Sequence, residues 1–174
     1  MDALAITNWF EDVAINLKVI GHVTDEEGKS RFARNIDELI EGLRRKTPCT
    51  ELTLVMDEPY GQLQSPAPDE FQDVPVTTFM ILKKVKENDW QDEDVVFDAA
   101  KKAAFKIWSK ALKEKKDFYT GENLTGIMKN LSPGTFRYRK EYLRGHWLFG
   151  VHCTFSFVDP INTELVYDAA DWSF

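Results

Sequence analysis

The sequence has little of what several familiar classes of protein depend on. Among 174 residues there are two cysteines, Cys49 and Cys153, too few and too far apart for a disulfide framework or a cysteine-based metal site. No apolar run approaches the roughly 18–20 residues of a membrane span, and the first residues lack the basic stretch of a secretory signal. We therefore expect a soluble intracellular protein with two free, partly buried thiols.

Positive charge is also in deficit, with 22 Lys and Arg against 29 Asp and Glu and a formal net charge of −7. This balance argues against a dedicated nucleic-acid binder. Basic residues nevertheless gather in a predicted helix, where Lys102, Lys106, Lys110 and Lys113 share a face. That face is either a solvated surface or a contact surface for an acidic partner or for passing DNA.

Motifs that would mark a catalytic or cofactor site are missing from the sequence. It contains neither phosphate-binding glycine pattern and no serine nucleophile elbow. His146 and His152 on one strand would lie about 20 Å apart, so they cannot share a metal ion. His152 and Cys153 would point to opposite faces of that strand. We thus predict no catalytic, cofactor or metal residue, and the alternative is an enzyme whose site combines distant residues, with Cys49, His22 or His152 as candidates.

The first half of the chain predicts two helices, a strand and a long loop. The helices cover about residues 3–20 and 29–46, although the β-branched run 15–23 also fits a strand. Residues 50–57 alternate as a strand that sets Leu52, Leu54 and Met56 on one face. The Pro-rich stretch 58–75 predicts an exposed loop that carries Tyr60 and Phe71.

The second half predicts most of a sheet and a long helix. In chain order we expect a central strand at 76–85, a helix from about 89–94 to 116, a short helix at 124–131, strands at 136–143 and 147–158, and an acidic, aromatic tail at 159–174. The helical spacing predicts that the long helix buries Val96, Ala99, Ala100, Ala103, Ile107, Trp108, Ala111 and Leu112. The whole chain, 1–174, is predicted to be a single α+β domain with a mainly antiparallel sheet and helices packed on one face.

The second half resembles the tail-terminator, or tail-completion, proteins of long-tailed bacteriophages. The similarity is a pattern of elements over about half the chain, carried by Val76-Thr77-Thr78-Phe79-Met80-Ile81-Leu82, the helix from Asp94 to Lys116, Leu124-Thr125-Gly126-Ile127-Met128, Phe136-Arg137-Tyr138-Arg139-Lys140-Glu141 and the strand from Trp147 to Phe157. The Pro-rich loop, the additional N-terminal helix and the tail depart from that pattern.

The resemblance implies a non-enzymatic structural protein of the virion, made in the host cytoplasm. Such a protein forms a hexameric ring that caps the tail tube and joins it to the head connector. No cofactor or membrane is implied, and DNA would at most pass through the ring lumen. Alternatives are another neck component, the enzyme above, or a peptide-binding adaptor.

Self-association is predicted to use the sheet side of the last hairpin. There Arg137, Arg139 and Arg144 would meet acids of a neighbour, with Glu164, Asp168 and Asp171 of the tail as candidates. Tyr60 and Phe71 of the Pro-rich loop would contact a neighbour or the tube. Trp172 and Phe174 complete the predicted interface, unless the tail folds back over its own subunit and buries them.

Overall fold

A computed structural model describes residues 2–24, 28–43, 47–57, 59–67, 70–87, 89–122 and 126–160. The elements are helices α1 (Ala3–Asn16), α2 (Ile36–Gly42) and α3 (Trp90–Thr120), strands β1 (Phe32–Ala33), β2 (Thr53–Met56), β3 (Tyr60–Ala67), β4 (Glu70–Lys84), β5 (Arg137–Leu143), β6 (Leu148–Ser156) and β7 (Asp159–Pro160), and the 3-10 turns η1 (Pro133–Thr135) and η2 (Arg144–His146).

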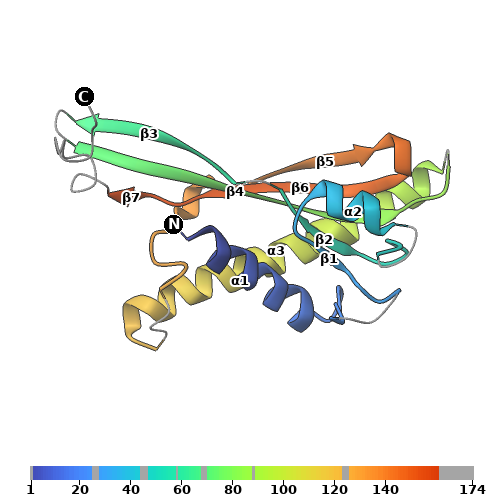
Figure 1. Cartoon of the computed structure of the whole chain (residues 1–174), viewed down its shortest axis with the longest axis horizontal. Coiled ribbons are helices and arrows are strands. Elements are labelled where there is room, and N and C mark those ends of the chain that lie inside the picture. Colours follow the sequence, from blue (N-terminus) through green and yellow to red (C-terminus); the bar gives the residue numbers. More distant parts are fainter. Residues whose placement is uncertain are drawn as a thin grey trace, which may run out of the picture.

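The sheet is organised around β4, whose 15 residues run its full length (Figure 1). On one side of β4 lie β2 and then β3, and on the other side lie β6 and then β7. β5 pairs with β6 at the outer edge, and only the two-residue pairing of β1 with β2 is parallel. The predicted α+β fold with a mainly antiparallel sheet is therefore confirmed.

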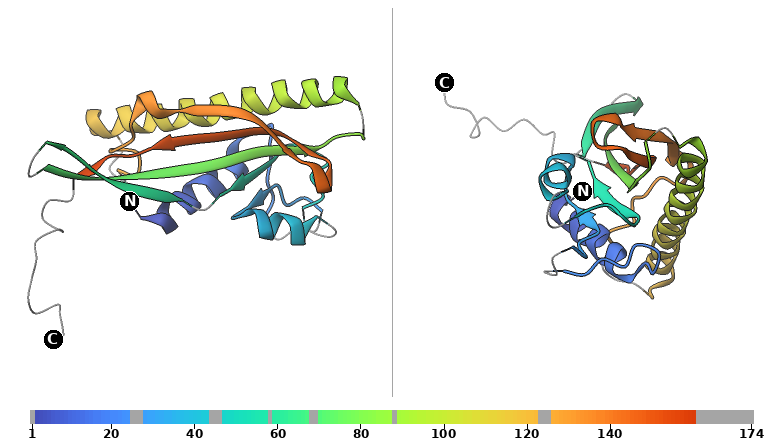
Figure 2. Two further views of the ribbon diagram at one scale, coloured as in Figure 1. Left: turned by 90° about the horizontal axis from the view of Figure 1, so that it is seen from above. Right: turned by 90° about the vertical axis from the view of Figure 1, so that its right-hand side faces the viewer.

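The main core lies between the sheet and the two longer helices, α1 and α3 (Figure 2). The ring of Phe10 on α1 lies 5.2 Å from that of Phe79 on β4 and 6.2 Å from that of Phe155 on β6. Leu52, Leu54 and Met56 belong to the same cluster, as their alternation predicts. This face of the sheet is covered by helices as expected from the sequence.

The short helix α2 packs on the opposite face, at one end of the sheet. Its buried Leu39 belongs to a cluster with Met80, Leu82 and Leu148, residues that alternate with those of the main core. The sequence did not predict this second, smaller layer. The other end of that face carries polar residues, among them Arg137, Arg139 and His152.

Two helices predicted in the N-terminal half are shorter than expected. The first ends at Asn16, and residues 17–23 form a turn and extended chain, so this segment is neither helix nor strand. Gly21 adopts φ +59°, and the β-branched residues that follow Asn16 have low helix propensity. In the second segment, Phe32 lies in β1, and α2 starts only after Asn35, whose side chain accepts a hydrogen bond from the Glu38 amide.

The predicted Pro-rich loop at 58–75 is wrong, because its described residues form β3 and the first part of β4. Tyr60 pairs with Val76 and Gln64 with Gln72, and a register shift precedes the pairing of Ala67 with Glu70. Prolines are tolerated here because Pro66 lies in an edge strand, and Pro75 lies between the stretches of β4 that pair with β6 and with β7.

Three further predictions in the C-terminal half need correction. Residues 126–131 form turns and one isolated bridge rather than a short helix, with Gly126 at φ +65°. The last hairpin turns through η2, which leaves Trp147 in the left-handed region outside β6. Ala99, predicted to be buried, is exposed on α3, whereas Ala104 is buried. Residues 124–125 and the tail beyond 160 lie outside the described residues.

Candidate assembly interface

The β3–β4 hairpin forms a projecting arm, defined here as residues 60–67 and 70–76. Figure 1 shows its tip extending past the end of the helices. Every residue of β3 is exposed, and Tyr60 and Leu63 keep 62% and 57% of their surface in contact with solvent. Phe71, on the facing strand, is half-buried. The residues predicted to form a loop are thus held in a paired ribbon that offers its outer edge to solvent.

The β4 strand of the arm is held to the body by β7 and the end of β6. Asp159 and Pro160 pair with Asp73 and Gln72 of β4, and the side chain of Asn130 donates a hydrogen bond to the Asp159 carboxylate. The Phe157 amide donates to the Pro75 carbonyl, and Ser156 pairs with Val76, so only the tip of the arm, beyond Gln72, is a two-stranded ribbon. The position of the arm relative to the sheet is set by β4, which continues without a break into the core.

Strand β5 forms the opposite edge of the sheet and carries most of the predicted interface arginines. Arg137 and Arg139 are exposed and lie on the face away from α3. The Arg137 guanidinium donates to the carbonyls of Gly134 and Phe136, both at 2.9 Å, and Arg139 lies 3.4 Å from Glu141 on its own strand. Neither contact uses a residue from another strand, so both arginines can meet a partner with modest rearrangement.

Arg144, the third arginine predicted at the interface, lies beyond β5 in the turn η2. Its guanidinium carbon is 5.8 Å from the ring centroid of Tyr142, and the residue is exposed. The structure thus places all three arginines along one outer edge of the molecule.

The other face of β5 meets α3 through an aromatic patch, defined by Phe105, Trp108, Phe136 and Tyr138. The rings of Phe105 and Tyr138 lie 5.5 Å apart, and Trp108 stacks on Phe136 at 4.9 Å. Phe105 and Tyr138 remain 43% and 44% exposed. The Lys101 ammonium lies 5.4 Å from the Tyr138 ring centroid, a cation–π distance. Phe105 was not predicted from the sequence, because it falls outside the buried stripe of its helix.

The arm and the β5 edge carry charge of opposite sign. In its described residues the arm contains the acids Glu70 and Asp73 and no basic residue. Strand β5 contains three basic residues, Arg137, Arg139 and Lys140, against the single acid Glu141. Within one subunit the structure does not bring Tyr60 and Phe71 together with the arginines. The tail residues Trp172, Phe174, Glu164, Asp168 and Asp171 lie outside the described part of the chain.

Two of the four lysines on the basic face of α3, Lys110 and Lys113, form ion pairs within the subunit. Lys110 pairs with Glu114 and lies 3.7 Å from Asp12, and Lys113 pairs with Asp117. Lys106 and Lys110 border a shallow hollow of about 130 Å³ between α1 and α3, floored by apolar groups of Val13 and Ile107. These contacts favour a solvated, internally balanced surface over a DNA-contacting one.

The thiol and imidazole candidates for an enzyme site lie in unrelated surroundings. Cys49, expected to be partly buried, is 2% exposed beneath α2, and burial raises the pKa of its thiol to about 11. Burial raises the pKa of Cys153 to about 12. His22 is buried and its Nδ1 accepts a hydrogen bond from the Arg31 amide at 3.1 Å. Both thiols are therefore held in the protonated form, which is a poor nucleophile.

His152 lies on the polar face of the sheet, beside Arg139 on β5. Its pKa is lowered, first by burial and then by the positive charge of Arg139, while Glu141 and Asp57 act in the opposite direction. In the ranges described above there is no group of three His, Cys, Asp or Glu side chains placed to hold a metal ion. None of the helices in the described ranges is both long enough and apolar enough to cross a membrane.

Comparisons with known proteins do not assign a family to this chain. No protein-family model matches it, and no curated protein matches it either.

Proposed function

We propose that this chain is a non-enzymatic structural protein of a phage tail or tail-like particle. In this role it forms a homo-oligomeric ring, hexameric by its resemblance to tail terminators, that caps the tail tube and joins it to the head connector. The ring is built in the host cytoplasm and becomes part of the virion. DNA passes at most through its lumen.

The observation that carries this proposal is the exposed arm at one end of a sheet whose other edge is also open. A long strand that is exposed on both faces is a liability in a monomer, because its unpaired backbone groups recruit other chains. Such a strand is suited to a protein that works in an assembly. The long helix followed by a closing hairpin, the arrangement on which the resemblance depends, is present as α3, β5 and β6.

The protonated state of the Cys49 thiol argues against the enzyme alternative. Cys49 was its principal nucleophile candidate, and burial keeps its thiol protonated near neutral pH. No contact in the described part of the structure joins Cys49 to His22 or His152.

Two measurements test the proposal: the mass of the assembled particle and its ability to cap growing tail tubes. Light scattering and electron microscopy of the purified chain should show a uniform ring of about six times the 20.1 kDa subunit mass. Added to polymerising tail-tube subunits encoded in the same genome, the ring should stop elongation and appear at one end of each tube. Tubes that grow to the same length with and without the protein would rule out a tail terminator.

A further inference from the structure

Two long strands have an open edge in the described part of the chain. β3 pairs only with β4, and β5 pairs only with β6. An open edge presents a row of backbone donors and acceptors that can bind another strand. The two edges lie on opposite sides of the same sheet, so one copy can use β3 while the next copy uses β5.

Strand β3 of the arm has no buried face of its own to stabilise it. All eight residues of β3 are exposed, and no helix covers them. A two-stranded ribbon is marginal in water, and independent stability requires a third strand or a packed face. β7 and the end of β6 supply a third strand beside β4 from Gln72 to Val76, so only the tip is two-stranded. The outer edge of β3 has no such neighbour among the described residues, and it is this edge that an additional strand would cover.

Leu63 of the arm and Tyr138 of β5 lie on the same side of the sheet, whereas Tyr60 lies on the other side. Leu63 faces Asp73, and residues 73, 75, 77 and 79 of β4 share one side, which at Phe79 is the helix-covered core. Tyr138 faces Cys153, whose side chain belongs to that same core. In a continuous sheet made from two copies, Leu63 of one copy would thus lie beside Tyr138 and Phe105 of the next.

Charge favours the same pairing. The arm contributes Glu70 and Asp73, and β5 contributes three basic residues against one acid. Two arms, or two β5 edges, would bring like charges together. Opposite charges across a contact steer the encounter and set its orientation, whereas like charges disfavour the wrong pairing.

We propose that copies of this chain associate head to tail, with the β3 edge of one copy adding to the β5 edge of the next. The partner of the arm is therefore a second copy of the chain. Because the surfaces differ, the contact is heterologous and generates a ring if the rotation closes or a filament if it does not. This inference deepens the proposed assembly role, and it rests on that role for closure into a ring.

The test is disulfide trapping in the full-length chain. Leu63→Cys is combined in one chain with Tyr138→Cys or with Lys140→Cys, which lies on the same face of β5. Paired residues on neighbouring strands have Cβ separations within reach of a disulfide. Mild oxidation should give a ladder of covalent dimers, trimers and larger species in at least one combination. Both native cysteines are buried and do not compete.

Matched controls identify the contact. Leu63→Cys with Arg139→Cys places the second thiol on the opposite face and should give no ladder. A mixture of the single variants Leu63→Cys and Tyr138→Cys should stop at dimers. Leu63→Glu should weaken association at least about tenfold, whereas Ile15→Glu, at a comparably exposed site on α1, should leave it unchanged.

Each outcome decides the inference. Covalent dimers of Leu63→Cys alone would mean an arm-to-arm contact, and a monomer at every concentration would mean that the edges do not pair; either result overturns it. Rings without a ladder would overturn the strand pairing and leave the assembly role standing. A ladder without tube capping would keep the pairing and overturn the tail-terminator role.

Discussion

Gly150 on β6 lies very close to the backbone of β4. A Cβ atom added to Gly150 would lie 1.9 Å from the carbonyl oxygen of Ile81. The atom it would meet belongs to the backbone of the central strand, so no side-chain rotation can relieve the contact. The requirement for glycine here is set by this approach and not by a positive φ angle.

We expect Gly150→Ala to lower the free energy of unfolding by more than about 3 kcal/mol, because two core strands must separate to admit one methyl group. Gly145→Ala is the matched control, since a Cβ there meets nothing within 4 Å. Urea denaturation of both variants measures the difference. Equal stability of the two would show that β4 and β6 are less closely paired than described.

His152 gives a second prediction at the residue scale, on the pH dependence of stability. Its pKa in the folded chain is below the ordinary value of 6.5, through burial and the nearby Arg139. When the pKa of a histidine is lower in the folded chain than in the unfolded chain, the free energy of unfolding decreases as pH falls below 6.5, until pH passes the folded pKa. His152→Gln should therefore flatten the fall in stability below pH 6.5, as measured by thermal melts across that range.

Arg139→Gln provides the control for this prediction. Removing the guanidinium should shrink the same pH dependence without abolishing it, because burial is the larger cause of the pKa shift. A pH profile unchanged in both variants would contradict the assignment of the fall to His152.

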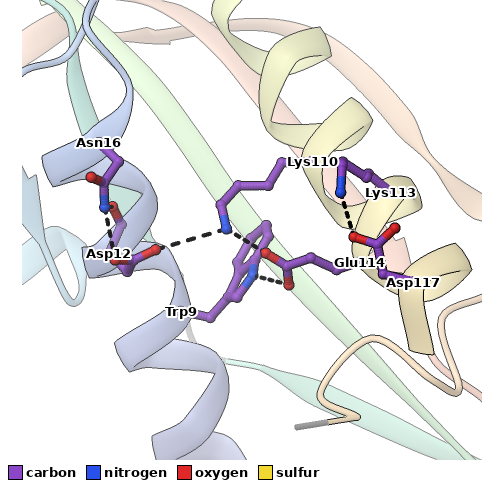
Figure 3. A network of polar contacts seen from close by, with 7 residues as sticks. All are labelled: Trp9, Asp12, Asn16, Lys110, Lys113, Glu114 and Asp117. Atoms are coloured by element: carbon purple, nitrogen blue, oxygen red, sulfur yellow. Dashed lines mark hydrogen bonds and ion pairs between the residues drawn. The ribbon is translucent and has the colours of Figure 1, made fainter. Parts of the chain in front are cut away.

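At the scale of elements, α1 and α3 are joined by a polar network at the edge of the core (Figure 3). The indole N–H of Trp9 on α1 donates to Glu114 of α3 at 2.7 Å, and Trp9 is only 5% exposed. Lys110 links the same carboxylate to Asp12 of α1 and lies over the Trp9 ring at 5.5 Å. Glu114 thus satisfies a buried donor as well as an ion pair.

Glu114→Ala should cost about 1–3 kcal/mol, because it leaves the Trp9 donor without its partner in a largely buried position. Asp117→Ala, which removes an ion pair with the 71% exposed Lys113 on the same helix, should cost much less, because solvent screens an exposed pair. Chemical denaturation of both variants tests the contrast. Similar losses would mean that the network is no stronger than an ordinary surface pair.

At the scale of the whole molecule, the long strand β4 connects two different regions. Its second half lies in the core between β2 and β6, and its first half forms the arm. The basic β5 edge and the acidic arm therefore stand at opposite sides and opposite ends of one sheet. This polarity is the property of the fold that supports head-to-tail assembly.

Truncation after Pro160 tests whether the arm or the tail is responsible for self-association. Because Asp159 and Pro160 pair with β4, a chain that ends there keeps the base of the arm. We expect light scattering to give the same oligomer for the truncated and full-length chains, with both weakened by salt. Loss of the oligomer on truncation would instead favour the tail acids predicted from the sequence, Glu164, Asp168 and Asp171.

The sequence by itself determined the elements that have one buried face. Alternation marked β2 and β6, a continuous apolar run marked the central part of β4, and helical periodicity marked α3, with Val96, Ala100, Ala103, Ile107 and Ala111 buried as predicted. In each case, burial on one side or two imposes a periodic pattern on the residues. The α+β class followed from the order of these elements.

Only the tertiary structure decided which segments become strands through backbone pairing without a buried face. β3 has no buried face, so its residues show no alternation, and its strand conformation depends on hydrogen bonds to β4, distant from the core. Phe32 was assigned to a helix because its neighbours are spaced helically, but parallel pairing with Leu54 places it in β1. The side of the sheet on which α2 packs, and the opposite placement of the arm and β5, depend on which strands become neighbours. Strand neighbours are set by long-range contacts that local periodicity does not encode.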